Sequence, residues 1–250
     1  MIIRILTLIF LLCWPASYSM AQTQNKIMTI DLENNKINIT TGFNGAHLTL
    51  FGVKKQPGDL AIVIQGPARQ MVVRRKDQIM GVWVNHDSLG FRNVPAYYDL
   101  ALSKAERKIA PAALMQSYGI GLDALNFDPV ANRSDPENIE RFKEALVRNK
   151  QRQGHFPLEP KNIIFLNDDF FRADFYVPSN VPTGDYSIKT YLFQQGKLRE
   201  INEKKLRVAQ VGFSAKLYKF AHLQGLAYGL VAVLMGLLAG AGGWLFLRQE

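Results

Sequence analysis

The chain of 250 residues carries 30 Lys and Arg against 21 Asp and Glu, which gives a formal net charge of +9. Its single cysteine excludes a disulfide-stapled scaffold and a cysteine zinc site. Hydrophobic residues make up 48% of the chain, so an ordinary apolar core has to stabilise the one large or two small domains that this length accommodates.

The first residues have the three regions of a secretory signal peptide. Arg4 supplies the positive charge, residues 5–14 are apolar but too few to span a membrane, and Ser19 and Ala21 are the small residues that signal peptidase recognises. We predict a signal peptide over residues 1–21, cleaved after Ala21. Cys13 would leave with it, and the bulky Leu12 before Cys13 argues against lipid attachment there.

Residues 27–102 have the pattern of many short strands. Alternating or short apolar runs cover 27–32, 36–40, 46–53, 60–65, 70–75, 80–85 and 97–102. Pro57 and Gly58 predict a hairpin that joins the third run to the fourth. Short strands at regular spacing are typical of a sandwich or barrel. The aromatic side chains along them are expected in the core: Trp83, Phe91, Tyr97 and Tyr98.

Helical signals interrupt the strands between residues 103 and 154. Ser103 and Glu106 have the spacing of a capping box, which predicts a helix start, and Pro111 divides this first helical stretch into two short helices. A longer helix is expected to begin near Pro136 and to end before Gly154.

The longer helix is expected to be amphipathic and to pack on a sheet. Its apolar face would carry Ile139, Phe142 and Leu146. Two ion pairs at i,i+4 spacing are expected on the exposed side: Glu137 with Arg141, and Glu144 with Arg148.

Strand signals return at 162–166, 171–177, 184–194 and 198–208, with a turn at Gln195 and Gly196. The third of these runs should place four side chains on one face: Tyr186, Ile188, Thr190 and Leu192. We therefore predict a mainly β protein. An immunoglobulin-like β-sandwich over residues 22–215, with an inserted helical segment at about 103–154, is preferred to two stacked β-domains.

The C-terminal region predicts one transmembrane helix. Residues 226–247 contain no charge and are long enough to cross a hydrocarbon layer, so we place the helix at 223–247 and a cytoplasmic tail at 248–250. With the signal peptide, this predicts a single-pass protein of the inner (cytoplasmic) membrane whose N-terminal domain lies in the periplasm. Basic residues that precede the helix oppose the positive-inside bias, but a long translocated domain outweighs it.

The membrane helix carries small residues at spacings of three and four, which place them on one face. Such a strip allows close backbone approach of another helix, either in a second copy of the chain or in a polytopic membrane protein. The strip comprises Gly225, Gly229, Ala232, Gly236, Gly240 and Gly243.

No catalytic motif is present, and we predict no enzyme activity, cofactor or metal. His86 with Asp87 is the best candidate for a polar site, because a carboxylate can orient an imidazole, but the composition of residues 85–88 favours a turn between two strands. Likewise, Asn167 to Asp169 could offer oxygen ligands to a cation, although a β-turn is favoured.

The basic residues indicate an anionic partner or a solvated face near lipid headgroups. Nucleic acid is not an expected partner outside the cytoplasm. One group of forked and point-charge donors could bind an oxyanion, whereas alternate strand positions often simply face water. This candidate anion site comprises Arg69, Arg74, Arg75 and Lys76.

Several sequence blocks resemble the alphaproteobacterial transmembrane protein family Alph_Pro_TM. They are GDLAIVIQGP (58–67), VVRRK (72–76), GVWVN (81–85), FRNVPAYY (91–98), FFRAD (170–174) and NVPTGDY (180–186), with Tyr228 at the start of the membrane helix. The resemblance implies an envelope protein with one C-terminal span, of unassigned biochemical function and often encoded beside sulfite-exporter-like permeases. It offers no catalytic residues to carry over.

Two functions from different classes are therefore considered. The first is a non-enzymatic accessory or regulatory subunit of a polytopic membrane transporter, such as an anion or sulfite-type exporter, held through the small-residue strip. The alternative is a membrane-anchored periplasmic module that binds a small anion or an acidic lipid through the region from Arg69 to Lys76.

Overall fold

The structure is a computed structural model that describes residues 26–130 and 135–247. The predicted signal peptide, the tail at 248–250 and Ser134, which precedes the helix start predicted near Pro136, lie outside the described residues.

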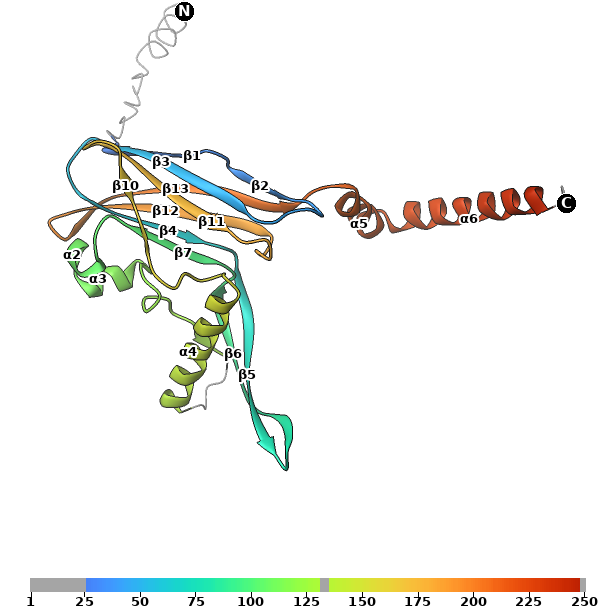
Figure 1. Cartoon of the computed structure of the whole chain (residues 1–250), viewed down its shortest axis with the longest axis horizontal. Coiled ribbons are helices and arrows are strands. Elements are labelled where there is room, and N and C mark those ends of the chain that lie inside the picture. The colour runs from blue at the N-terminus through green and yellow to red at the C-terminus, as the bar shows by residue number, and fades with distance from the viewer. Residues whose placement is uncertain (1–25, 131–134, 248–250) are drawn as a thin grey trace, which may run out of the picture.

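Two sheets pack face to face and form the upper part of the protein in Figure 1. One sheet has the order β1 (Met28–Leu32), β3 (Ala46–Lys54), β11 (Phe170–Val177) and β10 (Ile164–Phe165). The other has the order β2 (Lys36–Ile39), β13 (Lys197–Gln210), β12 (Gly184–Gln194), β4 (Asp59–Gln65), β7 (Tyr98–Leu102) and β9 (Lys161–Asn162). Within this pair of sheets, β2 runs parallel to β13 and β7 parallel to β9, and the other pairs are antiparallel.

The facing sides of the two sheets enclose one hydrophobic core. Side chains alternate between the faces of a strand, so every second residue of each inner strand enters this core. The six-stranded sheet contributes the face predicted for residues 184–194, and all four side chains on it are buried: Tyr186, Ile188, Thr190 and Leu192. The other sheet contributes Leu48, Leu50, Phe171 and Phe175.

The opposite face of the six-stranded sheet is also buried, because the helical segment covers it. That segment contains α2 (Glu106–Ile109), α3 (Ala112–Ser117) and α4 (Pro136–Arg152). From the sheet, Ala61, Val63, Leu100, Tyr191 and Phe193 meet the helix residues Ile109, Met115, Phe142 and Leu146 in a second core. The mainly β fold with an inserted helical segment is therefore confirmed.

A long hairpin projects from these layers beside α4 (Figure 1). It consists of β5 (Ala68–Ile79) and β6 (Val82–Pro95), and the short β8 (Asp128–Pro129) pairs with β6. Val73, Leu89 and Phe91 near its base are buried in the second core. Toward its tip the hairpin has no such cover, and its side chains become exposed.

Two turn predictions are wrong. Pro57 and Gly58 do not join a hairpin, because β3 and β4 lie in different sheets. A Cβ on Gly58 would lie 2.6 Å from the carbonyl oxygen of Phe193, so the glycine permits a close approach to β12 as the chain crosses between the sheets. The second error concerns residues 80–88: Met80 and Gly81 form the turn, whereas His86 and Asp87 lie within β6.

The predicted capping box at Ser103 is also wrong. The hydroxyl of Ser103 accepts a hydrogen bond from the backbone N–H of Leu60 at 2.9 Å, and α2 begins without a side-chain cap. The division at Pro111 is confirmed, since α2 and α3 lie on either side of it.

The longer helix agrees with the prediction at both ends. It begins at Pro136 and stops before Gly154, whose φ of +72° is the left-handed conformation that ends helices. On its surface Arg141 and Glu137 pair at 2.7 Å between Nη2 and Oε1.

Three of the four aromatic side chains predicted in the core are there, and one is not. Phe91, Tyr97 and Tyr98 are buried, as expected, but Trp83 is 65% exposed near the hairpin tip.

The chain ends in α5 (Phe213–Leu223), which was not predicted, and α6 (Gly225–Leu247). In Figure 1, α6 extends away from the sheets. Its residues 225–242 are apolar enough and long enough to span a membrane, and none of them is buried.

Candidate functional site

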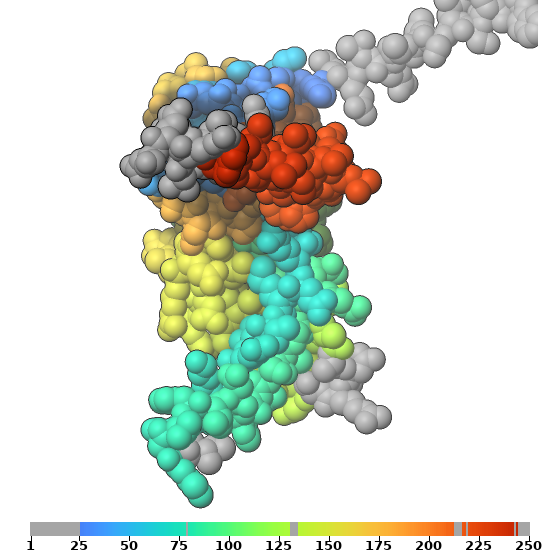
Figure 2. Space-filling view, turned by 90° about the vertical axis from the view of Figure 1, so that its right-hand side faces the viewer, coloured from blue at the N-terminus to red at the C-terminus, as the bar shows by residue number. Residues whose placement is uncertain are grey.

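An open groove of about 380 Å³ lies between β5 and α4. Its floor is apolar and consists of Val73, Phe142 and Ala145. Its rim is basic, with Arg74, Arg75 and Lys76 on the strand and Arg141, Arg148 and Asn138 on the helix. No carboxylate is among these lining residues. Figure 2 shows the two elements side by side, the hairpin in cyan to green and α4 in yellow.

Local geometry explains why these residues converge. On α4, residues 138, 141, 145 and 148 follow one another at spacings of three and four, so they share one face of the helix. On β5, three consecutive residues would normally alternate between the faces of the strand. The pairing with β6 shifts between Arg75 and Lys76 and leaves His86 without a partner in the ladder. Such a bulge adds local twist, which can turn neighbouring side chains toward one groove.

Three of the rim cations form no ion pair within the described residues. Arg141 is paired with Glu137, and Arg75 Nε lies 3.7 Å from Asp77 Oδ2. In contrast, Arg74, Lys76 and Arg148 have no carboxylate partner there, and the pair expected between Glu144 and Arg148 does not form. Neighbouring cations repel one another, so an anion bound between them would be stabilised.

Asp87 lies next to the groove and has other partners. Its two carboxylate oxygens accept hydrogen bonds from the backbone N–H of Ser88 at 2.8 Å and from Asn138 Nδ2 at 3.4 Å. It therefore orients Asn138. It does not contact His86, which is exposed, so the imidazole and carboxylate considered in the sequence are not brought together.

The structure places three of the four predicted anion-site residues on the groove and the fourth elsewhere. Arg69 lies at the base of the hairpin, where its Nη2 donates to the carbonyl oxygen of Thr183 at 3.1 Å. Sequence reasoning missed Asn138, Arg141 and Arg148. The helical spacing of the two arginines is visible in the sequence, but that spacing also predicts ion pairs on the solvent side.

Arg69 is exposed and lies beside a separate pair of buried basic residues, Lys150 and His155. Lys150 Nζ donates to the carbonyl oxygen of Ala96 at 3.2 Å, and burial, aided by the charge of Arg69, lowers the pKa of Lys150. His155 Nε2 lies 3.1 Å from the carbonyl oxygen of Asn180, and burial, aided by Lys150, lowers the pKa of His155. These contacts fasten the C-terminal end of α4 to the sandwich.

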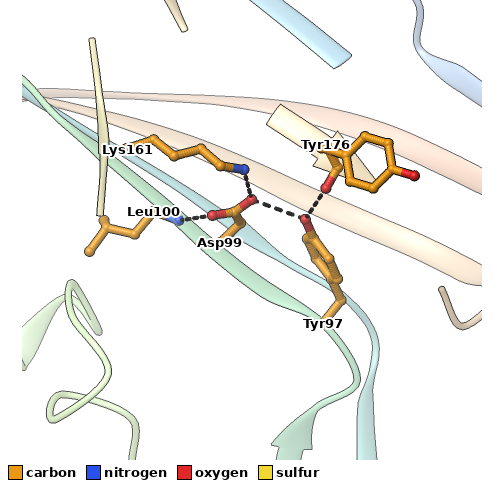
Figure 3. A network of polar contacts seen from close by, with 5 residues as sticks. All are labelled: Tyr97, Asp99, Leu100, Lys161 and Tyr176. Carbon is orange, nitrogen blue, oxygen red and sulfur yellow. Dashed lines mark hydrogen bonds and ion pairs between the residues drawn. The ribbon is translucent and has the colours of Figure 1, made fainter. Parts of the chain in front are cut away.

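A buried carboxylate network joins β7 to β9 and β11 (Figure 3). Asp99 is 4% exposed, pairs with Lys161 and accepts hydrogen bonds from the Tyr97 hydroxyl at 3.0 Å and the Leu100 N–H at 2.9 Å. The Tyr97 hydroxyl also lies 3.2 Å from the carbonyl oxygen of Tyr176. Burial, followed by Asp99, raises the pKa of Tyr97 far above its usual range. Each polar group has a partner, so the network holds the sheets together.

A second hollow is bordered by basic residues but is largely neutralised. It measures about 690 Å³ and is lined by Lys104, Arg107, Lys108 and Lys161, together with Glu106. Lys104 pairs with Asp59 at 2.8 Å, and Lys161 pairs with Asp99. The groove beside α4 is therefore the stronger candidate for an anion.

The β-turn prediction at Asn167 is confirmed. Its side-chain oxygen accepts hydrogen bonds from the backbone N–H groups of Asp169 at 3.0 Å and Phe170 at 2.6 Å. Across the described stretches, 26–130 and 135–247, no three His, Cys, Asp or Glu side chains gather in a way that could hold a metal ion.

Four glycines of the small-residue strip of α6 have no close neighbour among the described residues. A Cβ at Gly225, Gly229, Gly236 or Gly240 would meet nothing within 4 Å, and Ala232 is exposed. Gly243 lies in the same helix. Association through this strip stays a prediction.

The sheets, the helical layer and the apolar C-terminal helix define a mainly β protein with one candidate membrane span among the described residues. A family model described as "Putative transmembrane protein (Alph_Pro_TM)" matches residues 28–249. The chain therefore belongs to this transmembrane protein family. No curated protein matches the chain.

Proposed function

We propose that this protein is a non-enzymatic, membrane-anchored module that binds an anionic ligand in the groove between β5 and α4. The observation that carries the proposal is the basic rim, in which Arg74, Lys76 and Arg148 have no carboxylate partner within the described residues. The domain is proposed to lie in the periplasm after removal of the signal peptide, with α6 in the inner membrane and the C-terminus in the cytoplasm.

The floor of the groove narrows the class of ligand. Phe142 and Val73 are almost fully buried and, with Ala145, form an apolar surface beneath the cations. An anion that carries an apolar group could place its charge at the rim and its apolar part on this floor. An acidic lipid headgroup with the start of its acyl chain, or a small aromatic acid, has this chemistry.

We expect phenyl phosphate to bind the full chain in zwitterionic nanodiscs more tightly than inorganic phosphate does. Binding of both should weaken as salt is raised, because the attraction is electrostatic. Arg148→Gln should weaken phenyl phosphate binding by roughly tenfold, the usual worth of one charge-assisted hydrogen bond. Isothermal titration calorimetry measures each affinity.

Arg207→Gln is the matched control, because Arg207 is an exposed arginine on β13 that does not line the groove. It should bind as the unchanged protein does. Equal weakening by Arg207→Gln and Arg148→Gln would show a nonspecific charge effect and contradict the groove.

A second candidate function is the accessory subunit of a polytopic transporter. It is supported by α6, whose small-residue face has no neighbour within the described chain. A lipid anchor needs no such face, whereas close packing against another membrane helix does. The partner would be a polytopic membrane protein or a second copy of the chain.

Gly229→Leu with Gly236→Leu is expected to abolish recovery of a crosslinked partner from native membranes. The bulky side chains would separate the helix backbones while leaving the distant β-sheets folded. Leu230→Phe with Leu237→Phe enlarges two exposed side chains at the same spacing on another face, and should preserve recovery. Purification through a C-terminal tag and mass spectrometry gives the readout, and retention of the partner by the leucine variant would refute docking through the strip.

A further inference from the structure

The tip of the β5–β6 hairpin exposes a cluster of large apolar side chains. Met80 is 99% exposed, Trp83 65%, Val82 63% and Val84 37%. No charged residue lies between positions 79 and 84. The hairpin carries these side chains well away from both hydrophobic cores (Figure 1). These side chains therefore add little to the stability of either core.

The turn at the tip does not require an apolar residue. Met80 and Gly81 have φ values of +49° and +81°, the left-handed pair that two-residue hairpin turns use and that normally favours Asn-Gly. The turn between β12 and β13 has nearly the same values, +50° and +72°, and places Gln195 before Gly196. The same backbone conformation thus carries a polar side chain elsewhere in this chain, and methionine at position 80 needs another explanation.

Three basic residues lie on β5 a short distance before the apolar tip. Lys76 precedes Met80 by four positions, which is roughly 13 Å along a strand. Arg74 and Arg75 lie just behind it. Interfacial protein segments place their apolar side about 5–10 Å into the boundary between headgroups and acyl chains. A tip inserted to that depth would bring these cations to the level of the lipid phosphates.

The hairpin also lies on the appropriate side of the molecule. Figure 2 views the protein from the side toward which α6 extends and shows the hairpin along its length. In Figure 1 the hairpin points across the direction of α6, so its tip enters the bilayer when the β-sheets tilt on the connection to α6. Because α6 tethers the chain to a bilayer, a lipid surface is permanently within reach of that face. Gly212, with a φ of +118°, precedes α5 in the connection from the sheets to the membrane helix.

We propose that the hairpin tip docks onto the bilayer that α6 spans, with Met80, Val82 and Trp83 inserted among the lipids and Arg74 to Lys76 bound to anionic headgroups. This second membrane contact would fix the orientation of the β-sheets relative to the membrane. The proposal shares Arg74 to Lys76 with the groove but does not rest on ligand binding there, since the inserting residues do not line the groove.

The test uses the full chain with Cys13→Ser and Val84→Cys, labelled with the environment-sensitive dye nitrobenzoxadiazole. In proteoliposomes that contain phosphatidylglycerol, we expect the emission to rise several-fold and shift to shorter wavelength relative to detergent solution. Nitroxide-labelled lipids should quench it. Adding Met80→Gln and Trp83→Gln should abolish the response, and both positions are exposed, so the fold should be retained.

The control label at Leu158→Cys reports on another exposed apolar residue, which is 80% exposed and lies outside the hairpin. The emission of this label should change neither with phosphatidylglycerol nor with the nitroxide-labelled lipids. The same response of the labels at 84 and 158 would overturn the proposal. A label at 84 that is shielded from water in native membranes but not in proteoliposomes would also overturn it, because a protein partner, not lipid, would then cover the tip. An equal response in phosphatidylcholine alone would overturn the role given to the cations.

Arg148→Gln separates this inference from the proposed function. It should weaken phenyl phosphate binding while leaving the dye response unchanged. The variant with Met80→Gln and Trp83→Gln should do the opposite.

Discussion

Replacing Asp99 with alanine is expected to lower the free energy of unfolding by about 3 kcal/mol. The carboxylate is buried and serves three donors. Its removal takes this acceptor from the Leu100 N–H, leaves the Tyr97 hydroxyl only the carbonyl oxygen of Tyr176, and leaves Lys161 without its counter-charge. The Lys161 side chain is 33% exposed and can partly turn to water, which keeps the loss below that of a fully enclosed pair.

Thermal unfolding of the full chain in detergent, followed by near-ultraviolet circular dichroism, measures the change, because the buried aromatic side chains report on the sheets rather than on α6. For a domain of this size, 3 kcal/mol corresponds to a decrease in Tm of roughly 6–12 °C. Asp31→Asn is the control: Asp31 pairs with Lys204 at the surface, where such a pair adds little.

A double variant tests the cause. Asp99→Leu with Lys161→Met removes both charges together, so it should be more stable than Asp99→Ala with Lys161 retained. A double variant as unstable as Asp99→Ala, or a near-wild-type Asp99→Ala, would mean that the ion pair does not hold β7 to β9.

The mainly β fold could be predicted because its signals are local. The alternation of apolar residues in 184–194 specified which side chains enter the core, and Pro136 and Gly154 marked the ends of α4. These features depend on a few neighbouring residues and on periods of 2.0 and 3.6, which tertiary contacts here reinforce.

Which strands pair, and which group a side chain bonds, could not be predicted, because both depend on residues that are distant in the sequence. The sequence around Pro57 indicates a change of direction but not whether β4 joins the sheet of β3. Ser103 has the spacing of a helix cap, yet its hydroxyl is used by Leu60, which is 43 positions earlier. In both places a non-local contact prevails over a local preference.

The candidate groove shows the same limit. The three basic residues of β5 were recognisable as a run of charge, whereas the contribution of α4 required knowing that this helix lies beside that strand. Arg69 belongs to the same charged region in sequence and is separated from the groove in space, since its guanidinium is fixed at Thr183. The charged region of the sequence therefore holds three residues that line the candidate groove and one that lies elsewhere.

Gly52→Ala is expected to destabilise the protein by about 3 kcal/mol or more. Gly52 pairs directly with Phe171 on β11, and a Cβ on Gly52 would lie 2.2 Å from Cζ of that ring. The ring is fully buried, and β3 is held between β1 and β11, so neither the ring nor the strand can move away freely. The methyl group must displace an aromatic side chain from the main core.

Gly42→Ala is the matched control, because a Cβ there meets nothing within 4 Å and the backbone is not in the left-handed region. It should leave Tm unchanged or raise it slightly. Phe171→Leu should cost stability alone, through the cavity that it leaves, but should cost less in the Gly52→Ala protein, where the added methyl occupies part of that space. Strictly additive losses in the double variant would show that the ring and the glycine do not compete for the same volume, and the contact assigned to them would then be wrong.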